Sequence, residues 1–215
     1  MEVWKAQKEI RKILGMRMIH LNGQEQRYRW IHKEHPNDGH MGELEFVFES
    51  NLDKIPVWFI LERMDEFQVF LNGHAGSGEH DGWFLDREFT KQYLGKVEKG
   101  RNIITVKCYY RNDMELENCY LMGKFGVNDD RKLIPLPSKL VPGDWTKQGF
   151  KHFCGSIVYQ VEYVVNKEHE RIIMKLPEMQ GVCVNVMVNG ENWKLPWNFE
   201  KILDITDLIK RGINK

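Results

Sequence analysis

The sequence predicts an all-β protein made of two antiparallel β-sandwiches in tandem, preceded by a short helix. Short runs of alternating apolar and polar residues, separated by Gly, Asn and Asp, recur along the chain, as is typical of antiparallel sheets. Two of these runs read almost alike: FQVFLNG starts at Phe67 and VNVMVNG starts at Val184. Their separation far exceeds a solenoid repeat, which indicates a duplicated domain.

The composition is that of a folded protein without a charge bias. Hydrophobic residues make up 42% and charged residues 29% of the 215 residues, and 31 basic residues balance 31 acidic ones. A chain without net charge gives no electrostatic reason to bind nucleic acid or an anionic membrane, so neither is expected as a partner. Charged residues interrupt the N-terminus too often for a signal peptide, and a cytoplasmic location is therefore expected.

Residues 1–17 are predicted to form an N-terminal helix that acts as a linker. Val3, Ile10, Ile13 and Leu14 fall roughly on one face of a helix with 3.6 residues per turn.

Residues 18–128 are predicted to form the first sandwich. Asn72-Gly73 closes one strand with the two residues that most readily adopt the positive φ angles of a type I′ hairpin turn. The expected strands are Glu43–Ser50, Val57–Glu62, Phe67–Leu71, Asn102–Tyr110 and Cys119–Val127.

Residues 129–144 are predicted to be an extended connection, because they hold three prolines and a run of charges. The connection is too apolar for a loose linker, so the two sandwiches are expected to pack together.

Residues 145–215 are predicted to form the second sandwich, with Asn189-Gly190 as the counterpart of the first turn. Alternation places the four valines of Val182–Val188 on one face, and Cys183, Asn185 and Met187 on the other. The expected strands are Ser156–Val165, Arg171–Leu176 and Val182–Val188.

The similarity extends beyond the turns to a Gly-x-Asn motif, Gly100 to Asn102 in the first unit and Gly212 to Asn214 in the second. Each glycine is expected to end a one-turn helix and each asparagine to open a strand. The first unit continues with that strand, whereas the sequence stops at Lys215. We expect a fragment or an aberrantly short product that lacks its last strand; the alternative is a strand supplied from elsewhere, for instance by another copy.

The four cysteines form no C-x-x-C pair and are expected to be free buried thiols. The alternative is a Cys108–Cys119 disulfide across a hairpin centred on Asp113-Met114.

No catalytic residues, metal site or cofactor are predicted. Acidic residues lie in turn-like contexts where solvated acids are common. His74 and His80 flank a Gly-rich loop with Glu79 and Asp81, which could hold a metal, but such loops are more often hairpin tips. The acids considered as catalytic pairs are Asp65, Glu66, Glu79, Asp81, Asp86, Asp129 and Asp130.

Carbohydrate contact is the binding function that the side chains favour, through Trp83, His152, Trp193 and Trp197. Aromatic faces stack on the C–H groups of sugars, and the loop tryptophans follow the two Asn-Gly turns. The alternative is that these rings cover the sandwich core and that His152 caps a loop.

A set of residues in the second half resembles a known family. The set comprises Gly149, Phe150, Phe153, Gly155, Tyr159, Asn189, Gly190, Asp204, Thr206, Leu208, Gly212 and Asn214. Residues 140–215 are similar to the sugar-binding, jelly-roll domains of the galactose-binding-like type in glycoside hydrolases of the family 2 kind. The first unit matches more loosely, and two such units in tandem resemble the C-terminal region of α-L-rhamnosidase-like enzymes.

This resemblance implies an accessory, non-catalytic role in a glycoside hydrolase, with a glycan or the parent enzyme's catalytic domain as partner. One alternative is a free-standing carbohydrate- or protein-binding module. A small independent glycosidase is the third hypothesis.

Overall fold

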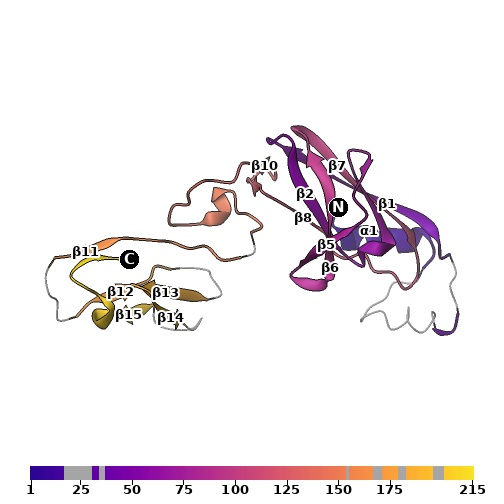
Figure 1. The fold of residues 1–215 in the computed structure, drawn as a ribbon. Coiled ribbons are helices and arrows are strands. Elements are labelled where there is room, and N and C mark those ends of the chain that lie inside the picture. Colours follow the sequence, from indigo (N-terminus) through magenta and orange to yellow (C-terminus); the bar gives the residue numbers. More distant parts are fainter. Residues whose placement is uncertain (17–30, 34–36, 154, 167–170, 179–182, 196–200) are drawn as a thin grey trace. The chain divides into compact units, whose positions relative to one another are not determined.

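Strands dominate the computed structural model of the chain (Figure 1), which confirms a mainly β protein with a helix near its N-terminus. The structure describes all residues except 17–30, 34–36, 154, 167–170, 179–182 and 196–200. Two compact units can be distinguished, unit 1 (residues 1–153) and unit 2 (residues 154–215).

Unit 1 contains ten strands among its described residues, arranged in two sheets. The strands are β1 (His40–Ser50), β2 (Ile55–Glu62), β3 (Phe67–Leu71), β4 (His74–Ala75), β5 (His80–Phe84), β6 (Asp86–Val97), β7 (Gly100–Tyr110), β8 (Tyr120–Gly123), β9 (Gly126–Val127) and β10 (Leu133–Ile134). One sheet has the order β4-β3-β7-β1-β10-β9 and the other β5-β6-β2-β8. Neighbouring strands pair antiparallel except β1 and β10, which are parallel at Ser50 and Leu133.

The two sheets share one hydrophobic core, as in a β-sandwich. Val57, Phe59 and Leu61 of β2 share one face of the strand and are buried in this core, and Ile60 on the opposite face is buried as well. The first three pack with residues of the other sheet, among them Val69, Leu71, Ile104 and Val106.

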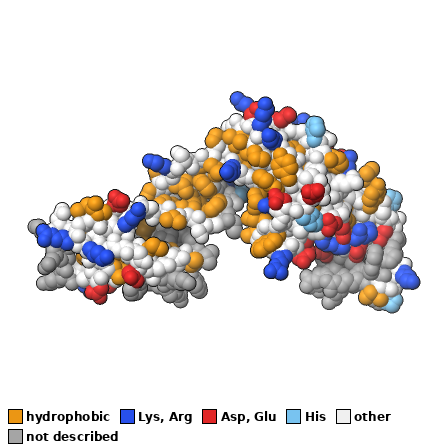
Figure 2. All heavy atoms as spheres, in the orientation of Figure 1, with side chains coloured by type: hydrophobic (Ala, Val, Ile, Leu, Met, Phe, Trp, Pro, Cys, Tyr) orange, Lys and Arg blue, Asp and Glu red, His pale blue; other side chains and the backbone are white. Residues whose placement is uncertain are grey.

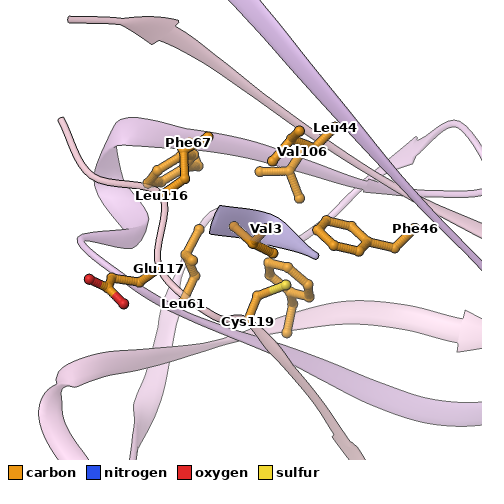
Figure 3. A pocket seen from close by; sticks show the side chains of 10 residues that line it. Val3, Leu44, Phe46, Leu61, Phe67, Val106, Leu116, Glu117 and Cys119 are labelled. Atoms are coloured by element: carbon orange, nitrogen blue, oxygen red, sulfur yellow. The ribbon is translucent and has the colours of Figure 1, made fainter. Parts of the chain in front are cut away.

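Helix α1 (Val3–Ile13) packs against a second hydrophobic cluster, which adjoins this core through Leu44 and Phe67. Val3, Ile10 and Leu14 pack against a cluster that includes Tyr110 and Leu116, whereas Ile13, expected on the same face, is 80% exposed. Figure 3 shows Val3 among side chains from both sheets, where a free volume of only about 10 Å³ remains. The helix therefore fills one end of the sandwich.

Strands β5 and β6 were not predicted from the sequence, which suggested only an aromatic cluster and turns where they form a hairpin. The alternative of a hairpin around Asp113-Met114 is not realised, because β8 pairs with β2 rather than with β7. Cys108 and Cys119 are consequently free thiols, and burial raises the pKa of Cys119 to about 11. Cys183 is also free but exposed, which corrects the expectation that it is buried.

Residues 129–153 are part of unit 1. The expected connection contains β10, which pairs with β1 and β9. The 3-10 helix η2 (Trp145–Gln148) leads to Gly149, whose carbonyl accepts a hydrogen bond of 2.7 Å from the amide of Val127. Phe150 bridges to Val127 as well. The segment expected to open the second sandwich thus contacts the first unit.

Unit 2 contains three strand pairs among its described residues. β11 (Tyr163–Val165) pairs with β16 (Gly212–Asn214), β12 (Ile173–Lys175) with β15 (Ile202–Asp204), and β13 (Val184–Val188) with β14 (Glu191–Leu195). The 3-10 helix η3 (Thr206–Leu208) precedes β16.

The predicted faces of β13 are confirmed for the described residues. Val186 and Val188 are buried with Leu203 and Ile205, whereas Met187 is 62% exposed. Val182 lies outside the described residues.

A network of two asparagines joins the Asn-Gly turn to the Gly-x-Asn motif in unit 1. Asn102, which is fully buried, accepts hydrogen bonds at Oδ1 from Asn72 Nδ2 (3.0 Å) and the amide of Glu98 (2.9 Å). Its Nδ2 donates to the carbonyls of Glu98 (2.7 Å) and Gly100 (3.0 Å). Asn72 Oδ1 accepts from the amide of Ile103 (2.8 Å).

The same network recurs in unit 2. Asn214 Oδ1 accepts from Asn189 Nδ2 (2.8 Å) and the amide of Lys210 (2.8 Å). Its Nδ2 donates to the carbonyls of Lys210 (2.7 Å) and Gly212 (3.1 Å), and Asn189 Oδ1 accepts from the amide of Lys215 (3.1 Å). The Asn-Gly turn and the Gly-x-Asn motif therefore form the same hydrogen-bond network in both units.

The glycines of the motif begin strands, which corrects the expectation that they end helices. Gly100 and Gly212 have φ angles of +97° and +101°, in the region that L side chains rarely adopt. They open β7 and β16, and the asparagine is the third residue of each strand.

The stability of unit 2 should depend on pH through Asp204. Hydrogen bonds from Thr206, and then the guanidinium of Arg171 at 2.8 Å, lower the pKa of Asp204 to about 2 from a usual value of 3.8. Because the pKa of Asp204 is lower in the folded chain than in the unfolded chain, its carboxylate stabilises the folded state at pH values above the unfolded pKa. This contribution is lost as the pH falls towards the folded pKa of about 2. We expect the unfolding temperature of unit 2 to fall between pH 4 and pH 2 more steeply in the parent than in Asp204→Asn; equal slopes would contradict this role.

None of the described helices is long and apolar enough to cross a membrane.

Candidate functional site

A polar hollow lies beside the β5–β6 hairpin of unit 1, with a volume of about 240 Å³. The 3-10 helix η1 (Met64–Glu66) forms one wall, because it crosses from β2 to β3 next to the hairpin. The lining side chains are Arg63, Met64, Asp65, Glu66, His80, Glu88 and Thr90.

The charged side chains of η1 contact oppositely charged or basic neighbours. His80 Nε2 lies 2.9 Å from Asp65 Oδ1. Glu66 pairs with Arg63 and, at 3.2 Å, with Arg111. The pKa of Arg111 is raised by its hydrogen bond to Asp113 and further by Glu66, so its guanidinium remains a fixed positive charge beneath the wall.

Thr90 supplies an unused hydroxyl. Its Oγ1 is buried and has no hydrogen-bond partner among the described residues. A buried polar atom without a partner is uncommon in native proteins and invites a ligand or a water molecule. Thr90 lines the hollow, but its Oγ1 is itself buried.

Trp83 lies directly across the hairpin from Thr90. Residues that oppose each other in an antiparallel pair project to the same face of the sheet. The Trp83 side chain is 57% exposed, which is high for a residue of its size. The exposed indole of Trp83 is therefore the cross-strand neighbour of Thr90, one of the residues that line the hollow.

Two backbone conformations next to the hollow are unusual. Arg63, at the start of η1, has φ +53°, and Leu85, at the tip of the hairpin, has φ +66°. The left-handed region costs a non-glycine residue on the order of 1 kcal/mol or more, and such residues cluster at functional sites. Leu85 is also 60% exposed, so the tip presents apolar surface to solvent.

This arrangement suits a small ligand with several hydroxyl groups. Arg63 and His80 offer donors, whereas Asp65 and Glu88 offer acceptors. An exposed indole beside them can stack on an apolar C–H face. A site with one aromatic face and both kinds of hydrogen-bonding group is a typical design for carbohydrate recognition.

Two of the acids of the wall contact basic side chains: Asp65 contacts His80, and Glu66 pairs with Arg63 and Arg111. Glu62, the last residue of β2, has a pKa raised by burial and then by the neighbouring Glu117 and Glu88, but it does not line the hollow.

The metal-binding alternative around the Gly-rich loop is not supported by the fold. His74 lies in β4 and His80 in β5, which belong to different sheets. Within the described ranges, no group of three or more His, Cys, Asp or Glu residues is arranged to hold a metal ion. Asp81 instead accepts a hydrogen bond of 2.6 Å from Trp58 Nε1.

The four residues proposed for carbohydrate contact occupy different places. Trp83 is 57% exposed and pairs with Thr90, which lines the hollow, but it is not itself a lining residue. His152 is exposed in the turn after η2, away from the lining set. Trp193 lies in β14 opposite Val186, and Trp197 lies outside the described residues. Trp83 and Trp193 are not equivalent, because β14 pairs with the strand before the Asn-Gly turn whereas β5 pairs with β6.

Sequence reasoning missed most of the lining residues of the hollow. The sequence places Asp65, Glu66 and His80 in turn-like contexts, and it does not single out Arg63, Met64, Glu88 or Thr90. The site is hard to predict because η1 and β6 are far apart in the sequence. The alternation of Glu88, Thr90 and Gln92 is the sequence signal that could have indicated a strand there.

Comparisons with protein-family models, curated proteins and solved structures found no match to this chain. The case for a function therefore depends on the geometry of its own residues.

Proposed function

We propose that unit 1 is a non-catalytic carbohydrate-binding module whose site is the hollow beside Trp83. The observation that carries the proposal is the pairing of a 57% exposed tryptophan, Trp83, with Thr90, which lines a polar hollow of about 240 Å³. Thr90 also lines this hollow, and its buried hydroxyl has no hydrogen-bond partner among the described residues. The volume is below the range of roughly 300–1,000 Å³ typical of drug-sized ligands, so a single sugar residue is the expected occupant.

We further propose that the two units are copies of one jelly-roll plan of the galactose-binding-like type. The matching asparagine networks around Asn102 and Asn214 support this relationship. On this proposal the chain is an accessory region of a glycoside hydrolase, and its partners are a glycan and the catalytic domain of the parent enzyme.

The test is a binding measurement on a Trp83→Ala variant. Isothermal titration of the intact chain with a panel of neutral mono- and disaccharides should identify a ligand. Removal of the stacking ring should then weaken that ligand by about tenfold or more, since an aromatic contact contributes on the order of 1–2 kcal/mol.

Trp4→Ala is the matched control. Trp4 is 58% exposed on α1, so its loss removes a comparable indole without touching the hollow. Equal affinities of the parent and both variants, or no binding to any sugar of the panel, would contradict the proposal.

A further inference from the structure

The Asn-Gly turns of both units combine a reactive dipeptide with an open surface. An asparagine followed by glycine readily loses its side-chain amide, because no side chain hinders the glycine nitrogen when it attacks the γ-carbon. Gly73 and Gly190 are exposed, and no described residue beyond their chain neighbours lies within 4 Å of the position that a Cβ atom would take on either. Steric crowding therefore does not shield these turns. A third Asn-Gly pair, Asn22-Gly23, lies outside the described residues.

The side chain of Asn72 extends the pairing of β3 with β7 by one residue. The backbone amide of Asn72 donates to the carbonyl of Ile103 (2.8 Å), and Asn72 Oδ1 accepts from the amide of Ile103 (2.8 Å). Asn72 Nδ2 donates to Oδ1 of the buried Asn102 (3.0 Å). Both polar atoms on the γ-carbon are therefore held by partners near the start of β7.

Asn189 is held in the same way in unit 2, with one more hydrogen bond. Its backbone amide donates to the carbonyl of Lys215 (2.9 Å), and its Oδ1 accepts from the amide of Lys215 (3.1 Å). Its Nδ2 donates to Asn214 Oδ1 (2.8 Å) and to the carbonyl of Leu208 (2.7 Å). In both units, the amide group that deamidation removes is thus a hydrogen-bond donor of the network.

Deamidation requires the γ-carbon to be free to turn towards the nitrogen of the following glycine. That nitrogen bonds to the γ-carbon and gives up its proton, the bond from the γ-carbon to Nδ2 breaks, and ammonia leaves. Water then opens the cyclic imide at either of its two carbonyl carbons, the nitrogen regains a proton, and aspartate or isoaspartate results. Because Oδ1 and Nδ2 must first leave their partners, the reaction proceeds from an opened state of the unit.

The product does not fit the network. An aspartate at position 72 sets a carboxylate oxygen, which only accepts hydrogen bonds, against Asn102 Oδ1. Asn102 cannot turn to offer its own amide, because its Oδ1 also accepts from the amide of Glu98 and its Nδ2 donates to backbone carbonyls. An aspartate at position 189 opposes Asn214 Oδ1 in the same way. Isoaspartate also lengthens the backbone of the turn by one carbon.

We propose that Asn72 and Asn189 are deamidation sites that the two asparagine networks protect, and that conversion of either residue permanently disrupts the network of its own unit. The rate at each turn is governed by the opening of that unit. Figure 2 shows acidic and basic side chains interspersed on the described part of the visible surface. A mixed surface of this kind does not strongly raise or lower the local concentration of hydroxide, which promotes the reaction.

The test is peptide mapping by mass spectrometry of the intact chain during incubation at mildly alkaline pH, with asparagine, aspartate and isoaspartate resolved at each turn. Both turns should react about tenfold or more slowly in the folded chain than in concentrated denaturant, because several hydrogen bonds must open first. Asn102→Ala should accelerate the reaction at Asn72 by about fivefold or more and leave Asn189 unchanged. Asn214→Ala should do the reverse.

Gln68→Ala is the matched control, because Gln68 is exposed on β3 and its loss should leave both rates unchanged. The parent chain provides a test without substitutions: low concentrations of urea should accelerate each turn in step with hydrogen exchange of its own unit. Equal rates in the folded and denatured chain at both turns would overturn the proposal. Unchanged rates at Asn72 in Asn102→Ala and at Asn189 in Asn214→Ala would overturn it as well.

The effect of conversion is tested with the direct products. Asn72→Asp should speed hydrogen exchange in unit 1 alone and Asn189→Asp in unit 2 alone, by about tenfold or more, because each removes a donor and opposes two acceptors. Asn185→Asp, the same change at an exposed position of β13, should have little effect on exchange. If neither turn variant changed the exchange of its unit, conversion would not disrupt the networks and the proposal would fail.

Discussion

Replacement of Asn102 by alanine is expected to destabilise unit 1 by about 3 kcal/mol, because a buried polar group that loses its partner costs about 1–3 kcal/mol. The side chain is fully buried and makes four hydrogen bonds. Its removal leaves the amide of Glu98 and the carbonyls of Glu98 and Gly100 without these partners. Asn102→Asp should be no better, since it retains the acceptor but loses both donated bonds.

The measurement is hydrogen exchange of unit 1 as a function of denaturant, because the chain has two units and a single unfolding transition cannot be assumed. Gln68→Ala is the control: Gln68 is exposed on β3, and its loss should change the stability by less than about 0.5 kcal/mol. Asn214→Ala should have the same effect on unit 2. If the free energy of unfolding fell by less than about 1 kcal/mol in both units, the asparagine hydrogen-bond network would not be a major source of stability.

Replacement of Arg11 by alanine should be comparably severe, with a loss of about 2–4 kcal/mol from unit 1, because it leaves buried polar groups without a partner and opens a void. Arg11 is 2% exposed on α1 and donates through Nη1 to the hydroxyl of Tyr110 (3.2 Å) and the carbonyl of Asn112 (3.3 Å). These bonds join the helix to the end of β7. Lys12→Ala, the next residue and exposed, is the matched control.

The helix variants can be compared by trypsin cleavage in α1 and by thermal unfolding. Arg11→Ala should expose Lys5 and Lys8 to cleavage, because the helix is held by its contacts with unit 1 rather than by its own length. If Arg11→Ala and Lys12→Ala were equally stable and equally resistant, α1 would be a linker, as the sequence suggested, rather than part of the sandwich.

The strands with clear alternation were predictable from the sequence. The bounds of β3 match the expectation at both ends, and the faces of Val186 and Met187 were assigned correctly. These strands have one buried face, so the period of two is strong in the sequence. Strand β6 was missed because Asp86–Val97 mixes polar and apolar residues and contains Gly95, which blurs the period.

The candidate site was only partly predictable. Trp83 was named because a tryptophan after a Gly-rich turn is conspicuous, but Thr90 and Arg63 were not. Their proximity depends on how the β5–β6 hairpin passes η1, which is a matter of tertiary packing. The Asn102 and Asn214 motifs were recognised as repeats, yet their role as hydrogen-bond partners of Asn72 and Asn189 appears only in the folded chain.

The most direct test of the proposed function is a residue-resolved NMR titration of the chain with the sugar that binds best. The proposal predicts that the indole resonance of Trp83 and the amides of residues 63–66, 80 and 88–90 shift together with a single affinity, while the indole of Trp4 does not. Shifts confined to other parts of the chain, or none at saturating sugar, would contradict carbohydrate binding at this hollow.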